Sequence, residues 1–341
     1  MPRFKQWAVI AAMAALGAAA QAAPRDNLDV RVSVPNPVLR GDVDVTVTVT
    51  VTNTARHPVN LLKWQLPSDE LEGALFKITR DDQPVAYLGP LVKRTAPQAA
   101  DKVKLEAGAS LSYEVELTGA YDLSQSGRYA IEYVSRGKHD DAATLASAPV
   151  YVWLEGRSMS KPVTPPPSGS GISYTGNCSA SQQGLLVQAV NAATSYATTA
   201  TTYLSGTPSA TPRYTTWFGA YSSAGWNTAK SHFVAVQSAF TTQALVLDCK
   251  CKKPSVYAYV YPTQPYKIYV CGAFWNAPMT GTDSKGGTLI HEMSHFNVVA
   301  GTDDWAYGQT AAKALAISDP AKALDNADSH EYFAENTPAQ P

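Results

Sequence analysis

Two histidines and a glutamate stand at a spacing that can activate water on a metal ion. His291 and His295 lie four residues apart in His-Glu-Met-Ser-His, so on a helix both imidazoles project from one face. Zinc in a hydrolytic site takes three protein ligands and lowers the pKa of a bound water in the fourth position. Glu292 can reach that water as a general base. The same residues can also meet by chance on a solvated helix, so the motif alone leaves that alternative open.

A third ligand is expected shortly after these histidines. We expect the helix to continue from His295 through Ala300, and Gly301 then supplies the residue type that commonly ends a helix and reverses the chain. The chain can therefore fold back and bring Asp303 or Asp304 to the metal. The chemistry of the residues does not choose between these two carboxylates.

The segment from Gly301 to Gly308, Gly-Thr-Asp-Asp-Trp-Ala-Tyr-Gly, resembles the Gly-Thr-x-Asp-x-x-Tyr-Gly signature of the aspzincin metallopeptidases. This family includes deuterolysin and the fungal peptidyl-Lys metalloendopeptidases. The resemblance implies that Asp304 joins His291 and His295 as the third ligand of one zinc ion per chain. It also implies that Tyr307 supports the substrate carbonyl oxygen, a role that a phenol can fill as a hydrogen-bond donor. The resemblance therefore implies a zinc metalloendopeptidase that acts on proteins or peptides.

An acidic pair further along the chain bears on specificity. Asp328 and Glu331 are three residues apart, so they share a face of a helix. Two carboxylates at the wall of a partly buried pocket favour a Lys or Arg side chain. The segment resembles the acidic pocket of the peptidyl-Lys metalloendopeptidases, which implies cleavage on the N-terminal side of Lys or Arg. A solvated acidic face is the alternative, and His330 is expected to be a neighbour because the metal already has three ligands.

Length and charge restrict the organisation and the partners. A chain of 341 residues exceeds the usual size of one domain, so two domains are expected. The formal net charge is -1, and without a long run of like charge there is no reason to expect a nucleic-acid or membrane-surface partner.

The first 22 residues have the pattern of an export signal. Arg3 and Lys5 precede a short apolar segment, and Ala20-Gln21-Ala22 is a small-x-small cleavage site. A transmembrane anchor would need about 20 apolar residues, and this segment is shorter. We therefore expect a signal peptide over residues 1–22 and a secreted protein.

Residues 23–155 show the alternation of half-buried strands. Valines alternate with Asp and Thr over residues 43–51, the period-two pattern of a strand with one buried face. Similar runs, separated by turn residues, occupy 28–34, 111–117, 128–134 and 149–154. The pattern predicts an all-β sandwich of immunoglobulin-like type, although the Cys-Trp-Cys mark of true immunoglobulin domains is absent.

This sandwich is expected to be a propeptide. A secreted hydrolase endangers the cell that makes it, and aspzincins are generally made as precursors, so we expect the domain to assist folding and to block the cleft. One hypothesis is that it inserts a side chain, perhaps a lysine, into the acidic pocket. The alternative is a passive accessory or carbohydrate-binding domain. Residues 156–173 form a linker rich in Pro, Ser and Gly, which we expect to be extended and to contain the maturation site.

Residues 174–341 are expected to form a mainly α, α+β zincin-like catalytic domain. Helices are predicted after Ser179 and from Trp226, where apolar residues recur at helical spacing. Val256–Val260 and Lys267–Val270 predict a hairpin. Thermolysin-like zincins commonly hold the substrate backbone on a strand edge beside the zinc helix, and this hairpin is the candidate; a purely structural cover is the alternative.

All four cysteines lie in the catalytic half. In an exported protein an even count indicates disulfides, and four cysteines allow three pairings. Joining Cys249 to Cys251 would strain the short loop between them, which leaves two pairings. The resemblance implies that Cys178 pairs with Cys249 and Cys251 with Cys271.

Two other classes of function stay open at this point. A secreted binding protein on a degenerate peptidase scaffold would have lost at least one catalytic position, and none is visibly lost. A hydrolase of another extracellular polymer, such as cell wall or glycan, would keep the metal site but act on a different bond.

Overall fold

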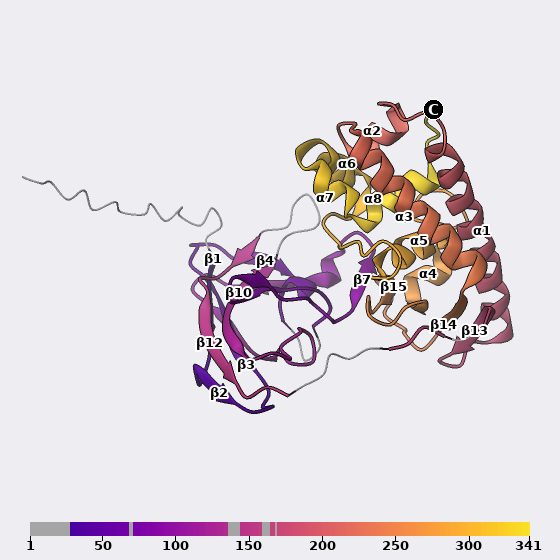
Figure 1. The fold of residues 1–341 in the computed structure, drawn as a ribbon. Coiled ribbons are helices and arrows are strands. Elements are labelled where there is room, and N and C mark those ends of the chain that lie inside the picture. The colour runs from indigo at the N-terminus through magenta and orange to yellow at the C-terminus, as the bar shows by residue number, and fades with distance from the viewer. Residues whose placement is uncertain (1–27, 68–70, 136–143, 159–163, 168) are drawn as a thin grey trace, which may run out of the picture.

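The computed structural model describes residues 28–67, 71–135, 144–158, 164–167 and 169–341 (Figure 1). The predicted signal peptide lies outside the described residues. Strands predominate in the N-terminal half and helices in the C-terminal half, as predicted, and the two halves lie side by side (Figure 1). In the part of the chain that is described, no helix is both long and apolar enough to cross a bilayer.

The N-terminal half forms mainly antiparallel sheets around a shared apolar core, and only β2 pairs in parallel, with β12, among its described strands. One sheet has the order β1-β3-β9, from β1 (Leu28–Ser33), β3 (Thr46–Asn53) and β9 (Ser110–Glu116). A second has the order β2-β12-β10-β5-β6, from β2 (Val38–Arg40), β12 (Val150–Glu155), β10 (Gly127–Ser135), β5 (Phe76–Arg80) and β6 (Gln83–Pro84), with β11 (Leu145–Ala146) beside β10. A third pairs β4 (Val59–Leu62) with β8 (Lys102–Leu105), and short 3-10 helices span Lys63–Gln65 and Ala99–Asp101.

The strands predicted from alternation are all present. In β3 the valines are buried and the threonines lie on the opposite, partly exposed face, because successive side chains of a strand point to opposite sides. The predicted sandwich therefore has its strands where the pattern placed them. Its assignment to the immunoglobulin-like type stays a prediction.

One strand of the N-terminal half leaves the sandwich. The strand β7 (Leu91–Arg94) pairs antiparallel with β15 (Val256–Val260) of the C-terminal half. All four of its residues are buried. This strand was not predicted from the sequence, and it completes a mixed sheet of order β13-β14-β16-β15-β7.

The other strands of this sheet come from the C-terminal half. They are β13 (Gly171–Thr175), β14 (Ala244–Asp248) and β16 (Lys267–Val270), and β15 and β16 form the predicted hairpin. β13 differs from the expectation that the linker extends to residue 173, because Gly171, Ile172 and Ser173 pair in parallel with β14. Ile172 also packs against the catalytic core, so burial orders the end of a segment expected to be extended and unpacked.

The helices of the C-terminal half pack against the sheet and against one another. They are α1 (Ala180–Leu204), α2 (Pro212–Phe218), α3 (Ser223–Thr242), α4 (Gly272–Asn276), α5 (Lys285–His295), α6 (Gly308–Ser318), α7 (Pro320–Leu324) and α8 (Ala327–Glu335). Ser179 caps α1 by accepting a hydrogen bond from the Gln182 N–H, which satisfies a donor that the first helical turn leaves unpaired. The helices α1 and α3, which lie where helices were predicted, pack against α5, the helix that carries the two histidines (Figure 1).

Two disulfides fasten the catalytic half. Cys178 is bonded to Cys249 and Cys251 to Cys271, the pairs implied by the family resemblance. The first joins the start of α1 to the end of β14, and the second joins the segment after β14 to the start of α4. Both bridges therefore hold the sheet beside the helices.

Candidate active site

The helix α5 is buried along its whole length and ends earlier than predicted. It begins at the cap residue Ser284, whose Oγ accepts a hydrogen bond from the Gly287 N–H. It ends at His295 rather than Ala300, because Phe296 is already extended (φ -62°, ψ 129°). The side chain of Phe296 is buried in the core, and two β-branched valines follow it, which lowers the helical preference of this segment.

The reversal after α5 brings the signature segment against the helix. Gly301 adopts φ 63°, the left-handed conformation that glycine accepts without steric cost. Thr302 then donates its N–H to the Ser294 carbonyl at 3.1 Å. The chain therefore turns tightly enough to place Asp304 opposite the histidines.

Three ligand atoms converge at this point. The Nε2 atoms of His291 and His295 lie 3.3 and 3.5 Å from Asp304 Oδ1, and all three residues are buried. Zinc bonds of about 2.1 Å in a tetrahedron separate the ligand atoms by roughly 3.4 Å. Neither histidine Nε2 has a hydrogen-bond partner among the described residues, which is costly for a buried polar atom unless it binds an ion. The donor set therefore fits zinc.

The structure distinguishes the two neighbouring aspartates. Asp303 is half-buried and its Oδ1 accepts a hydrogen bond from the Asp304 N–H at 2.8 Å. Its backbone pairs with Asn326, where the chain enters α8. Asp303 therefore holds the loop, and Asp304 is the residue that meets the histidines.

The other ring nitrogens of the histidines each lie close to an oxygen atom. His295 Nδ1 lies 2.8 Å from the Thr302 carbonyl oxygen, and His291 Nδ1 lies 2.8 Å from Asp328 Oδ1. An acceptor at Nδ1 fixes the proton there and presents the Nε2 lone pair to a metal. The contacts of Thr302 and Asp328 with the histidines were not predicted; for Thr302, its place in the Gly-Thr signature is the only sequence signal.

Glu292 lies beside this cluster with both carboxylate oxygens buried and without a hydrogen-bond partner in the described part of the chain. Burial raises the pKa of Glu292 to about 7, while the two histidines act in the opposite direction. A carboxylate with a pKa near neutrality is well suited to take a proton from water and to return it.

Tyr307 joins the cluster to the strand from the N-terminal half. Its hydroxyl lies 2.6 Å from Asp304 Oδ2 and 2.8 Å from the carbonyl oxygen of Val92 in β7. The hydroxyl can donate its proton to either acceptor. A backbone carbonyl therefore lies within reach of the residue that the signature assigns to the substrate carbonyl.

The next residue of β7 fills an acidic pocket. Lys93 Nζ lies 2.6 Å from Glu331 Oε2, 3.1 Å from Asp328 Oδ1 and 3.7 Å from Asp283 Oδ1. Lys93 and Asp328 are 1% exposed and Glu331 is fully buried, so Asp328 and Glu331 line a buried pocket and not a solvated helix face. Burial alone would lower the pKa of Lys93, but the three carboxylates outweigh it and hold this pKa well above its usual value.

Two features of the pocket were not predicted. Asp283 lies in the loop before α5, where Tyr332 donates its hydroxyl to Asp283 Oδ1 at 2.7 Å. Asp328 belongs to both sites, since Oδ1 contacts His291 and Lys93 while Oδ2 accepts a hydrogen bond from the Gly308 N–H at 2.7 Å. Burial raises the pKa of the Asp328 carboxyl, but Lys93 and His291 outweigh it and hold the pKa below its usual range. His330 lies away from the metal cluster, with its Nε2 2.9 Å from His232 Nδ1.

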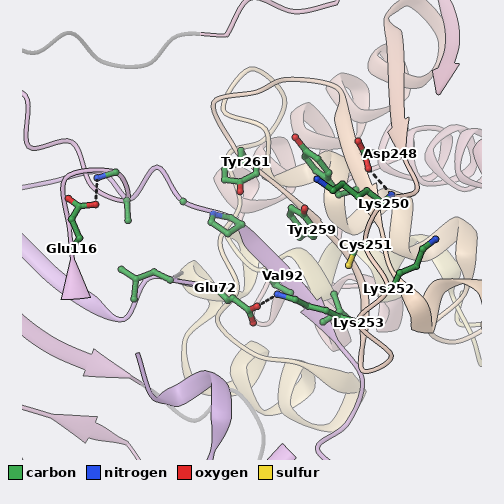
Figure 2. Close-up of a pocket in the computed structure, with 17 residues that line it drawn as sticks. Glu72, Val92, Glu116, Asp248, Lys250, Cys251, Lys252, Lys253, Tyr259 and Tyr261 are labelled. Atoms are coloured by element: carbon green, nitrogen blue, oxygen red, sulfur yellow. Dashed lines mark hydrogen bonds and ion pairs between the residues drawn. The ribbon is translucent and has the colours of Figure 1, made fainter. Parts of the chain in front are cut away.

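A wider cavity of about 620 Å³ lies between the two halves beside β7. Figure 2 shows Glu72 of the N-terminal half reaching Lys253, with Val92 close by. The other carboxylate oxygen of Glu72 lies 2.5 Å from Arg94 Nη2. Glu72 therefore links β7 to the catalytic half through Arg94, the residue directly after Lys93, and Lys253.

Known proteases resemble this chain over most of its length. Residues 203–335 match the profile of the aspzincin family, described as lysine-specific metallo-endopeptidase. An extracellular protease of Aeromonas hydrophila is 44% identical over 311 residues, which cover 87% of this chain and 89% of that protein. A peptidyl-Lys metalloendopeptidase of Grifola frondosa is 38% identical over 356 residues, covering 97% and 99%.

A solved structure also resembles part of this chain. A zinc peptidase from Grifola frondosa is 52% identical and covers 48% of this chain and 100% of that chain, with a TM-score of 0.47. The relatives from Aeromonas hydrophila and Grifola frondosa that match most of the chain bear the names of proteases, and neither a non-catalytic binding protein nor a glycan hydrolase agrees with those names. The chain belongs to the aspzincin family and is a zinc metalloendopeptidase.

Proposed function

We propose that this protein is a secreted endopeptidase, made as a zymogen, that cleaves peptide bonds on the N-terminal side of lysine. Its similarity to peptidyl-Lys metalloendopeptidases supports the specificity, and its similarity to an extracellular protease supports export. A signal peptide over residues 1–22 and a maturation site in the linker belong to the same proposal. The described residues between β12 and β13 form neither helix nor strand, which favours access by a protease.

In the proposed site His291, His295 and Asp304 hold one zinc ion. When bound, zinc polarises the scissile carbonyl and acidifies the attacking water. Glu292 takes the proton of that water and returns it to the leaving amine, and Tyr307 donates a hydrogen bond to the carbonyl oxygen as its charge grows. Two observations support these roles: the carboxylate of Glu292 has no hydrogen-bond partner among the described residues, and the Tyr307 hydroxyl lies 2.8 Å from the Val92 carbonyl oxygen.

Lys93 indicates how a substrate lysine would bind. Its ammonium group is compensated by Glu331, Asp328 and Asp283, which is the charge arrangement that a buried cation requires. The rings of Tyr257 and Tyr332 lie 5.5 and 5.8 Å from Nζ. Because the pocket closes around a compact ammonium group, we propose a preference for lysine over the wider guanidinium of arginine.

The same strand supports the proposed latency. β7 pairs with β15 and places Lys93 in the pocket, so the N-terminal half occupies the cleft that a substrate needs. This arrangement agrees with the hypothesis that the propeptide inserts a lysine. One observation carries the whole proposal: the carbonyl on Tyr307 belongs to the residue directly before the lysine in the pocket.

A substrate series with the mature catalytic domain tests this function. Peptides that differ only in Lys, Arg or Gln at one position should show kcat/KM for Lys above that for Gln by at least about 30-fold, since an unpaired buried charge costs about 2–5 kcal/mol. Cleavage without regard to lysine would contradict the proposal.

A catalytic variant tests the general base. Glu292→Gln should keep zinc and the fold but lower kcat by about 10²–10⁴-fold, the range for removal of general-base catalysis. A variant that still degraded casein at the original rate would refute the role of Glu292.

A further inference from the structure

We propose that the Val92–Lys93 peptide bond is a self-cleavage site, so that the inhibitory strand is also the first substrate of its own catalytic domain. The inference rests on the proposed function, because it requires hydrolysis before a lysine. It goes beyond that function by assigning a processing site inside the N-terminal half, well before the linker.

The strand β7 runs antiparallel to β15 in an extended form. In the antiparallel register Val92 lies opposite Tyr259, and Lys93 lies opposite Ala258. An extended peptide that adds a strand to a sheet edge is a common recognition mode, and β7 is added in this way to the edge of β15 that faces away from β16. The chain therefore passes the metal cluster in an extended form, with the carbonyl first and the lysine second.

The two groups that define a scissile bond are both engaged. The Val92 carbonyl oxygen lies 2.8 Å from the Tyr307 hydroxyl, which also contacts the metal-ligand candidate Asp304 at 2.6 Å. The side chain of the following residue, Lys93, reaches Glu331 at 2.6 Å. A strand that only blocked the cleft would need the lysine or the carbonyl contact, but would have no need for both in adjacent residues.

The strand is held on both sides of this bond. Tyr87 donates its hydroxyl to the Leu71 or the Pro90 carbonyl oxygen before the bond. After the bond, Arg94 is paired with Glu72, and Thr95 donates its N–H to the Ser255 carbonyl at 3.0 Å. Because the chain is fixed before and after the Val92–Lys93 bond, this bond lies at the catalytic site of the same molecule. The reaction then needs no diffusional encounter between substrate and enzyme.

The proposed step needs only water. A water oxygen bonds to the Val92 carbonyl carbon, the bond from that carbon to the Lys93 nitrogen breaks, and the Glu292 carboxyl carries the proton from the water to that nitrogen. The products are a carboxylate on Val92 and an amino terminus on Lys93. The single strand becomes two separate ends, each with part of the contacts to β15, so its hold on the cleft weakens.

The test uses the full-length protein. Purified chain is incubated under conditions that load zinc, and samples are denatured and analysed by mass spectrometry for a fragment that begins at Lys93. The wild-type chain should yield this fragment, at a rate constant that does not change with protein concentration. Glu292→Gln and Lys93→Gln should not yield it.

Matched variants control for charge and folding. Lys104→Gln removes an exposed lysine of the same sandwich, whose nitrogen pairs with Glu106, and this variant should be cut at Lys93 like the wild type. Lys93→Arg keeps the cation, so it should fold even if Lys93→Gln does not, and it should be cut more slowly.

The outcomes separate this inference from the proposed function. If the mature domain cleaves lysine peptides but the propeptide keeps the Val92–Lys93 bond intact through maturation, the inference is overturned and the proposed function stands. A cleavage rate that rises with protein concentration would overturn the intramolecular step. If the mature domain shows no preference for lysine in separate peptides, the proposed function itself fails.

Discussion

Replacement of Lys93 by methionine tests the lysine-in-pocket model of latency. Methionine keeps most of the length of the side chain but removes the charge that faces Glu331 at 2.6 Å and Asp328 at 3.1 Å. Removing one partner of a buried, hydrogen-bonded charge pair costs about 2–5 kcal/mol. At about 1.4 kcal/mol per tenfold, the Kd between the sandwich and the catalytic domain should rise by about 30- to 4,000-fold. In the free catalytic domain water can enter the empty pocket and hydrate the two carboxylates, which offsets part of this cost. We therefore expect an increase in Kd of about 100-fold.

The assay measures binding without cleavage. The sandwich has its own apolar core, so residues 24–155 can be expressed alone and checked for folding by circular dichroism. Titration into the mature domain carrying Glu292→Gln then gives Kd, because this variant should bind the strand without cutting it. Lys104→Met is the control, and since its side chain is 62% exposed the change in Kd should stay below about fivefold. Equal Kd values for wild type and Lys93→Met would refute the reasoning.

Two further variants test other parts of the site and core. Tyr307→Phe should lower kcat by about 10²–10³-fold with little change in KM, since it removes one hydrogen-bond donor to the developing oxyanion. Steady-state kinetics on a lysine peptide measures both constants, and an unchanged kcat would contradict the role of Tyr307. Burial, together with the nearby His232, lowers the pKa of His330 to about 3. In the unfolded chain the pKa of a histidine is about 6.5. The contribution of His330 to the free energy of unfolding is therefore complete above pH 6.5 and is lost as the pH falls toward 3. Denaturant titrations between pH 4 and 6 should show a pH slope for His330→Phe that is shallower by up to about 1.4 kcal/mol per pH unit, and a slope equal to that of the wild type would count against it.

The sequence predicts which residues form the site better than it predicts the strands and loops that surround them. The spacing of His291 and His295 places both imidazoles on one face, and the spacing of Asp328 and Glu331 does the same for the acidic pair. These are local, periodic relations, and the structure retains them. The alternation in β3 and the hairpin of β15 and β16 were predictable for the same reason.

The long-range relations were not predictable. β7 is four residues long and buried on both faces, so Leu-Val-Lys-Arg has no alternation to mark it, and its partner strand lies far along the chain. Asp283 reaches the pocket from a loop, and the contact of Asp328 with His291 depends on how α8 packs against α5. The early end of α5 depends on the burial of Phe296, and helix propensity does not predict this burial.

The central claim is that three side chains hold one zinc ion in the catalytic domain. Its most direct test is the zinc content of purified, folded protein, measured by elemental analysis for the wild type, Asp304→Asn and Asp303→Asn. The wild type and Asp303→Asn should contain one zinc ion per chain after dialysis, because Asp303 faces the backbone of its own loop. Asp304→Asn should lose most of its zinc while it stays folded. Full zinc content in folded Asp304→Asn, or none in the wild type, would contradict the account.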